Sequence, residues 1–245
     1  MNIQKKDITE FIYNNLSSKD FFLKIKRDGV NIISDEIEIE EINIPASYKL
    51  HKITNQNTLK KIEIDAYIDV RDVGDTVLEI ATGIKNWLQK EIKYGTLELS
   101  DDEELYYEAI CFNKLDIKEL LGKFGECKIV FTCRKTKAKS GDIPIKITNN
   151  YKIYNKHSKS YPLFKIKASG DIKININNNI LDIRNVEDSI IIDNETMNVY
   201  KEINNTLINQ NNKIYSNFIT IDSGENYISY TGNVQELILI PRWQA

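Results

Sequence analysis

The sequence predicts a mainly β protein with one α-helix, built as two domains. Apolar residues alternate with polar ones in both halves of the chain, which is typical of half-buried strands. Helical spacing behind a capping box occurs once, at residues 75–90. Residues 134–142 are basic, small and polar and lack apolar periodicity, so we interpret them as a linker. That segment can equally be a domain boundary. We therefore expect an N-terminal β-sandwich-like domain with the helix, residues 1–136, and a C-terminal β-sandwich, residues 137–245.

The first predicted strands precede the helix. Residues 21–29 alternate and end in an Asp-Gly dipeptide, which predicts the first arm of a hairpin. Residues 32–44 continue the alternation until it slips near Glu41, which indicates a bulge or the end of a strand. Residues 59–70 form the clearest strand of this half, with apolar side chains at every second position: Ile62, Ile64, Ala66, Ile68 and Val70.

The single helix is predicted at residues 75–90. Thr76 and Glu79 form a Thr-x-x-Glu capping box, in which the hydroxyl accepts from an early backbone N–H and the carboxylate reaches back to the cap. One apolar face follows at helical spacing: Val77, Ile80, Ala81, Ile84, Trp87 and Leu88. That face must pack on the sheet.

Three further strands complete the first half, and the cysteines lie near or within them. The strands are predicted at residues 95–99, 105–112 and 127–133, with an acidic turn at 101–104. Cys111, Cys127 and Cys133 form no Cys-x-x-Cys pair and are odd in number, which argues against a disulfide framework or a zinc site. Cys127 and Cys133 share one face of the last strand, so we interpret them as small buried side chains, with a redox role as the alternative.

The second half of the chain contains short strands at regular intervals separated by turn residues. About seven such strands within about a hundred residues are typical of a β-sandwich. They are predicted at residues 143–147, 162–168, 172–176, 189–193, 218–222, 226–230 and 236–240.

Charge and hydropathy exclude several classes of partner. Basic and acidic residues nearly balance, 33 against 36, so we expect no polybasic groove for direct, sequence-specific binding of nucleic acid. The N-terminus lacks the apolar stretch of a secretory signal, and no window approaches the roughly 18 apolar residues of a membrane span. We expect a protein that is made in the cytosol and neither spans a membrane nor leaves through a signal peptide.

Residues at a spacing suited to catalysis are scarce. The two histidines, His51 and His157, fall in different predicted domains and in no metal-binding motif, which disfavours metal-dependent hydrolysis. The sequence also lacks a glycine-rich phosphate loop and a Gly-x-Ser-x-Gly elbow. Residues 193–195 (Asp-Asn-Glu) lack the further ligands of a calcium loop, so we interpret them as a hairpin turn. We expect no catalytic, cofactor-binding or metal-binding residues.

Thirteen tyrosines are consistent with either strand formation or a recognition surface, since tyrosine serves both. Several lie in predicted loops or at strand ends: Tyr48, Tyr94, Tyr151, Tyr154 and Tyr161.

Ordered motifs in both halves resemble the distal tail (Dit) protein family of tailed phages, the baseplate hub of phages with Gram-positive hosts. In the first half the helix ends in Trp-Leu, a strand carries Tyr-Tyr-x-Ala, and the closing strand carries Phe-x-Cys. The second half contains a strand with an Asp turn, then a Gly-x-Asn hairpin, and then a Pro-Arg-Trp ending. The positions that carry this resemblance are Trp87, Leu88, Tyr106, Tyr107, Phe131, Cys133, Asp193, Gly224, Asn226, Pro241, Arg242 and Trp243.

The resemblance implies a structural subunit of a phage tail, or of a phage-derived particle such as a prophage product. It implies an N-terminal domain that closes into a hexameric ring through exposed strand edges, and a C-terminal galectin-like β-sandwich outside the ring. It implies as partners other copies of the chain, the tail tube protein, and the tail-associated hub, fibre or lysin protein. The resemblance also implies a location at the virion tail tip after assembly in the host bacterial cytoplasm, and no enzymatic activity.

Two other functions remain open on sequence alone. The C-terminal sandwich is compatible with a carbohydrate-binding module that recognises cell-wall sugar. The acidic turns at residues 35–36 and 101–104 contain paired carboxylates of the kind a glycoside hydrolase uses, although solvated turns are commonly acidic.

Overall fold

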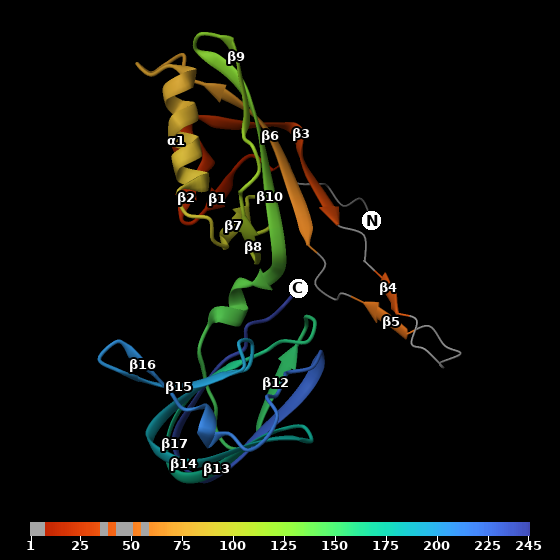
Figure 1. Ribbon diagram of the computed structural model, residues 1–245, viewed down its shortest axis with the longest axis vertical. Helices are drawn as coiled ribbons and strands as arrows, with labels where there is room; N and C mark the ends of the chain where they lie inside the picture. The colour runs from red at the N-terminus through yellow and green to blue at the C-terminus, as the bar shows by residue number, and fades with distance from the viewer. Residues whose placement is uncertain (1–7, 35–38, 43–50, 55–58) are drawn as a thin grey trace. The chain divides into compact units, whose positions relative to one another are not determined.

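The computed structural model describes residues 8–34, 39–42, 51–54 and 59–245 (Figure 1). The chain forms two compact units, residues 1–136 and residues 137–245, which we call unit 1 and unit 2. The architecture is mainly β with one helix, as the sequence predicts.

Unit 1 is built on an eight-stranded antiparallel sheet in the order β2-β1-β7-β8-β10-β6-β3, with β9 also paired to β10. A separate two-stranded sheet pairs β4 with β5. The strands are β1 (Phe11–Tyr13), β2 (Leu16–Ser17), β3 (Leu23–Ser34), β4 (Ile39–Ile42), β5 (His51–Thr54), β6 (Lys60–Asp69), β7 (Gly95–Leu99), β8 (Leu105–Ile110), β9 (Asp116–Leu121) and β10 (Phe124–Ala138).

The Asp-Gly dipeptide in β3 is a bulge, and the predicted hairpin turn there is wrong. β3 pairs with β6 on both sides of it, with a register shift between Ile25 and Val30. Asp28 has a φ of 55°, and a Cβ on Gly29 would lie 2.6 Å from the Asp65 carbonyl oxygen. Turns and bulges use the same residue types because both need a positive φ or a close backbone approach. The predicted return strand divides between β3 and β4, and its residues 35–38 and 43–44 lie outside the described residues.

Helix α1 (Val77–Gln89) confirms the predicted helix and its capping box. The Thr76 hydroxyl accepts a hydrogen bond from the Glu79 backbone N–H, and the Glu79 carboxylate accepts one from the Thr76 N–H. The helix lies along one face of the sheet (Figure 1), where Val77, Ile84 and Leu88 are buried. Within the described part of the chain, no helix is long and apolar enough to cross a membrane.

The core of unit 1 lies between α1 and the sheet. The strict alternation of residues 59–70 is confirmed, because β6 buries every second side chain. β10 alternates in the same way from Phe124 to Phe131, and Cys127 and Cys133 are buried, which confirms their interpretation as buried side chains. The largest fully buried side chains include Phe11, Tyr13, Leu23, Ile62, Ile64, Ile68, Ile84, Leu88, Leu97, Ile129 and Phe131.

Residues 134–142, interpreted from the sequence as a linker or domain boundary, contain the division between the two units, but they are strand and 3-10 helix and not an irregular linker. β10 continues to Ala138, and a short helix, η2, covers Lys139–Asp142. The segment 134–142 lacks apolar periodicity because several of its side chains have polar partners. The Lys60 ammonium donates to the Thr136 hydroxyl, and Lys137 forms an ion pair with Glu195.

Unit 2 contains a seven-stranded antiparallel sheet in the order β11-β17-β13-β14-β15-β16, with β12 also paired to β17. The strands are β11 (Ile145–Lys146), β12 (Tyr151–Asn155), β13 (Leu163–Ile176), β14 (Asn179–Asp193), β15 (Asn198–Ile203), β16 (Thr206–Asn209) and β17 (Gly224–Ile240).

Several predicted short strands of unit 2 merge into longer bent ones. Segments 162–168 and 172–176 join as β13, and segments 226–230 and 236–240 join as β17. The predicted turns between them are bulges with register shifts, where Gly170 and Gly232 have φ of 79° and 96°. Bulges bend strands, so β13 and β17 are each one long bent strand where two short ones were predicted. Segment 218–222 forms only an isolated bridge, through Ile221, and is not a strand.

Candidate functional site

Trp87 packs α1 against the rest of unit 1 through ring stacking. Its indole lies 4.3 Å from the Phe21 ring and 5.5 Å from the Phe11 ring, centroid to centroid, with interplanar angles of 2° and 10°. Its Nε1–H donates a 3.0 Å hydrogen bond to the Tyr13 carbonyl oxygen. Both faces of the indole and its polar group are therefore occupied within unit 1, and Leu88 beside it is buried.

The other motif positions of unit 1 line its core. Phe131 and Cys133 are buried on β10, and Tyr107 of β8 packs on the same core. Its neighbour Tyr106 lies on the opposite face of β8. Burial raises the pKa of the Cys133 and Cys127 thiols to about 12 and that of Cys111 to about 11. The thiols are therefore protonated at neutral pH, which makes them poor nucleophiles and metal ligands.

Four charged side chains form a network in unit 2, which we call the tail cluster: Lys137, Asp193, Glu195 and Arg242. The Arg242 guanidinium holds Asp193 through two nitrogens, at 2.6 and 3.2 Å, and reaches Glu195 at 3.3 Å. Lys137 pairs with Glu195 at 3.5 Å. Burial favours a raised pKa for Asp193, but Arg242 and the Thr196 N–H hold that pKa below its usual value. The Asp193 turn is the predicted hairpin turn, and its carboxylates are neutralised by side-chain cations.

The chain ending packs beside the tail cluster. Pro241 and Trp243 are buried, and the Trp243 carbonyl accepts a 3.0 Å hydrogen bond from the Ala138 N–H. The Arg242 N–H donates to the Gly141 carbonyl at 2.7 Å. A Cβ on Gly141 would lie 2.2 Å from the Trp243 nitrogen, so only glycine fits there.

Asn226 fixes the start of β17. Its side chain is fully buried and makes four hydrogen bonds. Its Oδ1 accepts from the Asp222 N–H and the Asn177 amide, and its Nδ2 donates to the Asp222 and Gly224 carbonyls. Gly224 has a φ of 93°, a backbone conformation that favours glycine.

Among the described residues, those considered for catalysis have structural roles. In the acidic turn at residues 101–104, the Asp102 carboxylate accepts from the Glu104 and Leu105 N–H groups, which is a turn-closing role. The side chain of His51 lies outside the described residues, as do residues 35–36, and His157 belongs to unit 2. No group of three or more potential metal ligands occurs among the residues that the structure describes.

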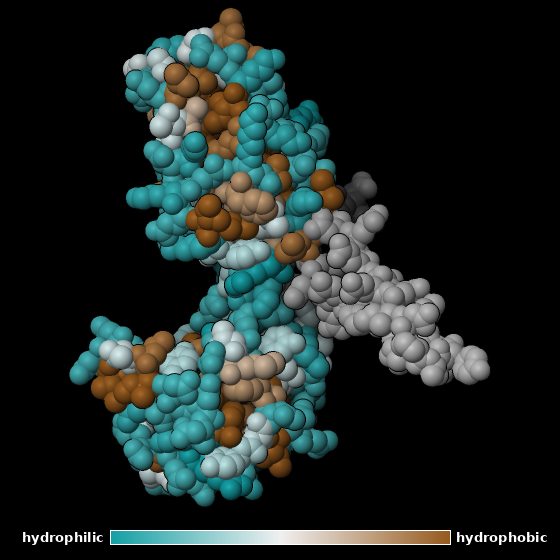
Figure 2. Space-filling view, viewed as in Figure 1, coloured by the Kyte–Doolittle hydropathy of each residue, from teal (hydrophilic) through white to brown (hydrophobic). Residues whose placement is uncertain are grey.

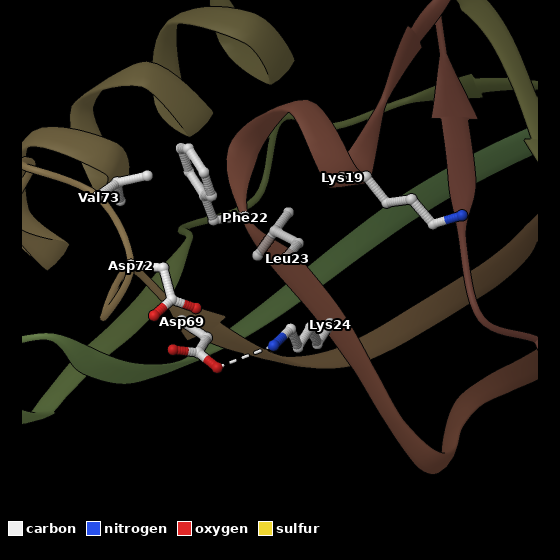
Figure 3. Close-up of a pocket in the computed structure, with 7 residues that line it drawn as sticks. All are labelled: Lys19, Phe22, Leu23, Lys24, Asp69, Asp72 and Val73. Carbon is white, nitrogen blue, oxygen red and sulfur yellow. Dashed lines mark hydrogen bonds and ion pairs between the residues drawn. The ribbon is translucent and has the colours of Figure 1, made fainter.

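A hollow of about 300 Å³ opens beside η1 (Ser18–Phe21) in unit 1 (Figure 3). Its carboxylate Asp69 is engaged by Lys24 at 2.9 Å and by Arg71 at 2.7 Å, and Arg71 and Lys24 hold the pKa of Asp69 well below its usual value. A carboxylate in this state is a poor general base. The hollow is lined by Lys19, Phe22, Leu23, Lys24, Asp69, Asp72 and Val73.

Strand β3 presents the longest unpaired edge of unit 1. It has 12 residues, and in the described part of the chain it pairs only with β6. Ile32 and Ile33 are 47% and 38% exposed. Apolar side chains elsewhere on the surface gather in separate patches framed by polar residues (Figure 2). An unpaired strand edge with exposed apolar side chains is a template for pairing with another chain.

Comparison with known proteins gives similarity in structure alone. No family model matches the sequence, and no curated protein matches it. The structure is similar to the crystal structure of the Dit protein (gp 19.1) of phage SPP1, described as a paradigm of the hub adsorption apparatus in phages that infect Gram-positive hosts. The TM-score is 0.69 at 12% sequence identity, over 95% of this chain and 97% of that one. The chain therefore has a Dit-like fold, as its motifs predicted.

Proposed function

We propose that the chain is a structural hub protein at the tip of a phage tail, or of a phage-derived tail particle. Six copies form a ring that joins the tail tube protein to the tail-associated hub, fibre or lysin protein. Similarity to SPP1 Dit along nearly the whole chain supports the hub role. The observation that carries the assembly is the edge of β3, which is unpaired among the described residues and carries the exposed side chains of Ile32 and Ile33.

Ring closure requires a heterologous interface, in which one surface of a subunit meets a different surface of the next. The outer edge of β3 offers unpaired backbone donors and acceptors for such a contact, because its other edge is already used by β6. Pairing there would also cover Ile32 and Ile33. Unit 1 is accordingly the ring-forming domain of this proposal, and unit 2 the galectin-like sandwich outside the ring.

The proposed function involves no catalysis. The carboxylates of Asp102 and Asp193 have structural partners, and the three thiols have raised pKa values. The protein would act at the virion tail tip, after assembly in the bacterial cytoplasm, without a membrane and without reading a nucleic-acid sequence.

A charged substitution on the β3 edge tests the proposal. Ile33 lies opposite Lys61 in the β3–β6 ladder, so Ile33→Glu creates an opposite-charge cross-strand pair and preserves the subunit fold. The same charge opposes pairing at the outer edge. Native mass spectrometry should show hexamers for the wild type and monomers for Ile33→Glu.

Leu78→Glu is the matched control. Leu78 is 72% exposed in the first turn of α1, where a carboxylate is favourable. This variant should remain hexameric. Wild-type hexamers that persist unchanged in Ile33→Glu would argue against the β3 edge as the ring interface.

A further inference from the structure

Tyr154 and Tyr227, 73 positions apart in sequence, lie on one outer face of unit 2. β12 and β17 pair so that Tyr154 is opposite Glu225 and Lys152 is opposite Tyr227. Paired residues of a ladder share a face, and Tyr154 and Tyr227 are diagonal neighbours, about 7–8 Å apart at their backbones. The alternate residues Ile153 and Ile228 point into the core. The two rings therefore project from the same solvent-facing side.

Both rings are open to solvent. Tyr154 is 68% exposed and Tyr227 is 54% exposed. Exposed tyrosines present an apolar ring face together with a hydroxyl, a combination suited to amphipathic ligands. Trp243, by contrast, is buried in the chain ending.

Tyr227 is held in place before any ligand arrives. Its hydroxyl donates a 3.2 Å hydrogen bond to the Glu225 carboxylate. The Lys152 ammonium lies 5.5 Å from the ring centroid and pairs with Glu225 at 2.8 Å. Fixing the ring in advance reduces the entropy lost on binding.

Uncharged polar groups extend the surface onto the next strand. Ser229 of β17 has the same parity as Tyr227, and Asn175 of β13 lies directly opposite Ser229. Both side chains are half-buried on the outer face. The Ser229 hydroxyl can donate and accept hydrogen bonds, and the Asn175 amide nitrogen can donate, whereas the Asn175 Oδ1 is buried from solvent.

The charged groups next to the two rings, Lys152 and Glu225, form an ion pair at 2.8 Å. No excess of either sign favours an ionic polymer. Charged side chains also stand beside both tyrosines, whereas the centres of protein interfaces are depleted of charge. Sugars match better, because a pyranose offers apolar C–H faces for the rings and hydroxyls for the surrounding polar groups.

We propose that this face, which we call the tyrosine platform (Lys152, Tyr154, Glu225 and Tyr227), binds an uncharged oligosaccharide. The rings stack on the sugar, and the paired charges, Asn175 and Ser229 bind its hydroxyls. This site does not depend on the tail function and would serve a monomer as well as a ring.

Calorimetric titration of the full-length chain with uncharged hexasaccharides of glucose, galactose and N-acetylglucosamine tests the site. At least one should bind, and Tyr154→Ala and Tyr227→Ala should each weaken it about tenfold or more. Both variants should keep the wild-type melting temperature, because the rings are exposed. The control is Tyr215→Ala, which removes a 56% exposed tyrosine stacked on Arg184 in the same unit and should leave affinity unchanged.

Four results would overturn the proposal. The first is no binding of any of the three hexasaccharides at millimolar concentration. The second is an equal loss of affinity in Tyr215→Ala, and the third is binding that survives both platform substitutions. The last is binding of poly(glycerol phosphate) in place of the neutral sugars, which would assign an anionic ligand to this face. None of these results bears on whether the chain forms rings.

Discussion

The two units stabilise their key elements through different kinds of interaction. Unit 1 holds its helix through an indole between two phenyl rings, and this contact contains no ionisable group. Unit 2 holds its chain ending through Arg242 and Asp193, and the start of β17 through the amide of Asn226. Apolar stacking is insensitive to pH, whereas a partly buried ion pair requires both charges. We therefore expect the stabilities of the two units to respond differently to pH and to substitution of their motif residues.

The largest expected effect is loss of the indole in unit 1. Trp87→Ala removes both stacking contacts and the hydrogen bond to Tyr13, and should lower the free energy of unfolding of unit 1 by about 3–5 kcal/mol. Denaturant unfolding followed by circular dichroism measures this change. Leu78→Ala, at an exposed position of the same helix, should cost less than about 0.5 kcal/mol. Similar losses in the two variants would contradict the anchoring role of Trp87.

The next effect is loss of the carboxylate in the tail cluster. Asp193→Ala leaves the Arg242 guanidinium, 19% exposed, without its bidentate partner and should cost unit 2 about 3 kcal/mol. Glu187→Ala, at a side chain that is 83% exposed and 3.9 Å from Lys213, should cost less than about 0.5 kcal/mol. The same denaturant measurement applies, and a loss confined to unit 1 would be inconsistent with this role.

A smaller effect is expected where the chain ending approaches η2. Gly141→Ala places a Cβ against the Trp243 backbone and should destabilise unit 2 by about 1–3 kcal/mol. Gly122→Ala is the control, because a Cβ there meets nothing within 4 Å. Equal melting temperatures for the two variants would show that the chain ending can move away freely.

The smallest effect is a pH dependence of unit 2. The pKa of Asp193 is lowered in the folded state, so its contribution to stability is present above the unfolded value of 3.8 and is lost as pH falls through the folded pKa. The free energies of unfolding of the wild type and of Asp193→Asn should therefore differ most near neutral pH and become equal in acid. A gap that stays constant down to pH 2 would show that the charge of Asp193 is unimportant.

Sequence periodicity predicted the elements whose side chains alternate between core and solvent. β6 and α1 are examples, because their buried positions follow the strand and helix periods. β16 was missed because all four of its residues are exposed and give no alternation. The strand breaks placed near Gly170 and Gly232 were wrong because a bulge and a turn require the same backbone freedom.

The candidate sites were less predictable than the fold, because they depend on pairing between distant segments. Arg242 and Asp193 are 49 positions apart, and no local pattern links an arginine to one particular carboxylate. The sequence predicts Tyr154 in a loop or at a strand end, but its proximity to Tyr227 follows from the register of β12 on β17. A one-residue change of that register would turn one ring inward.

The central claim is that this Dit-like chain assembles into a ring. Negative-stain electron microscopy of the purified protein, alone and co-expressed with its tail tube protein, tests it most directly. The account predicts closed rings of six subunits with an open centre. Single particles of monomer size in both samples, with no incorporation into tail-like particles, would contradict it.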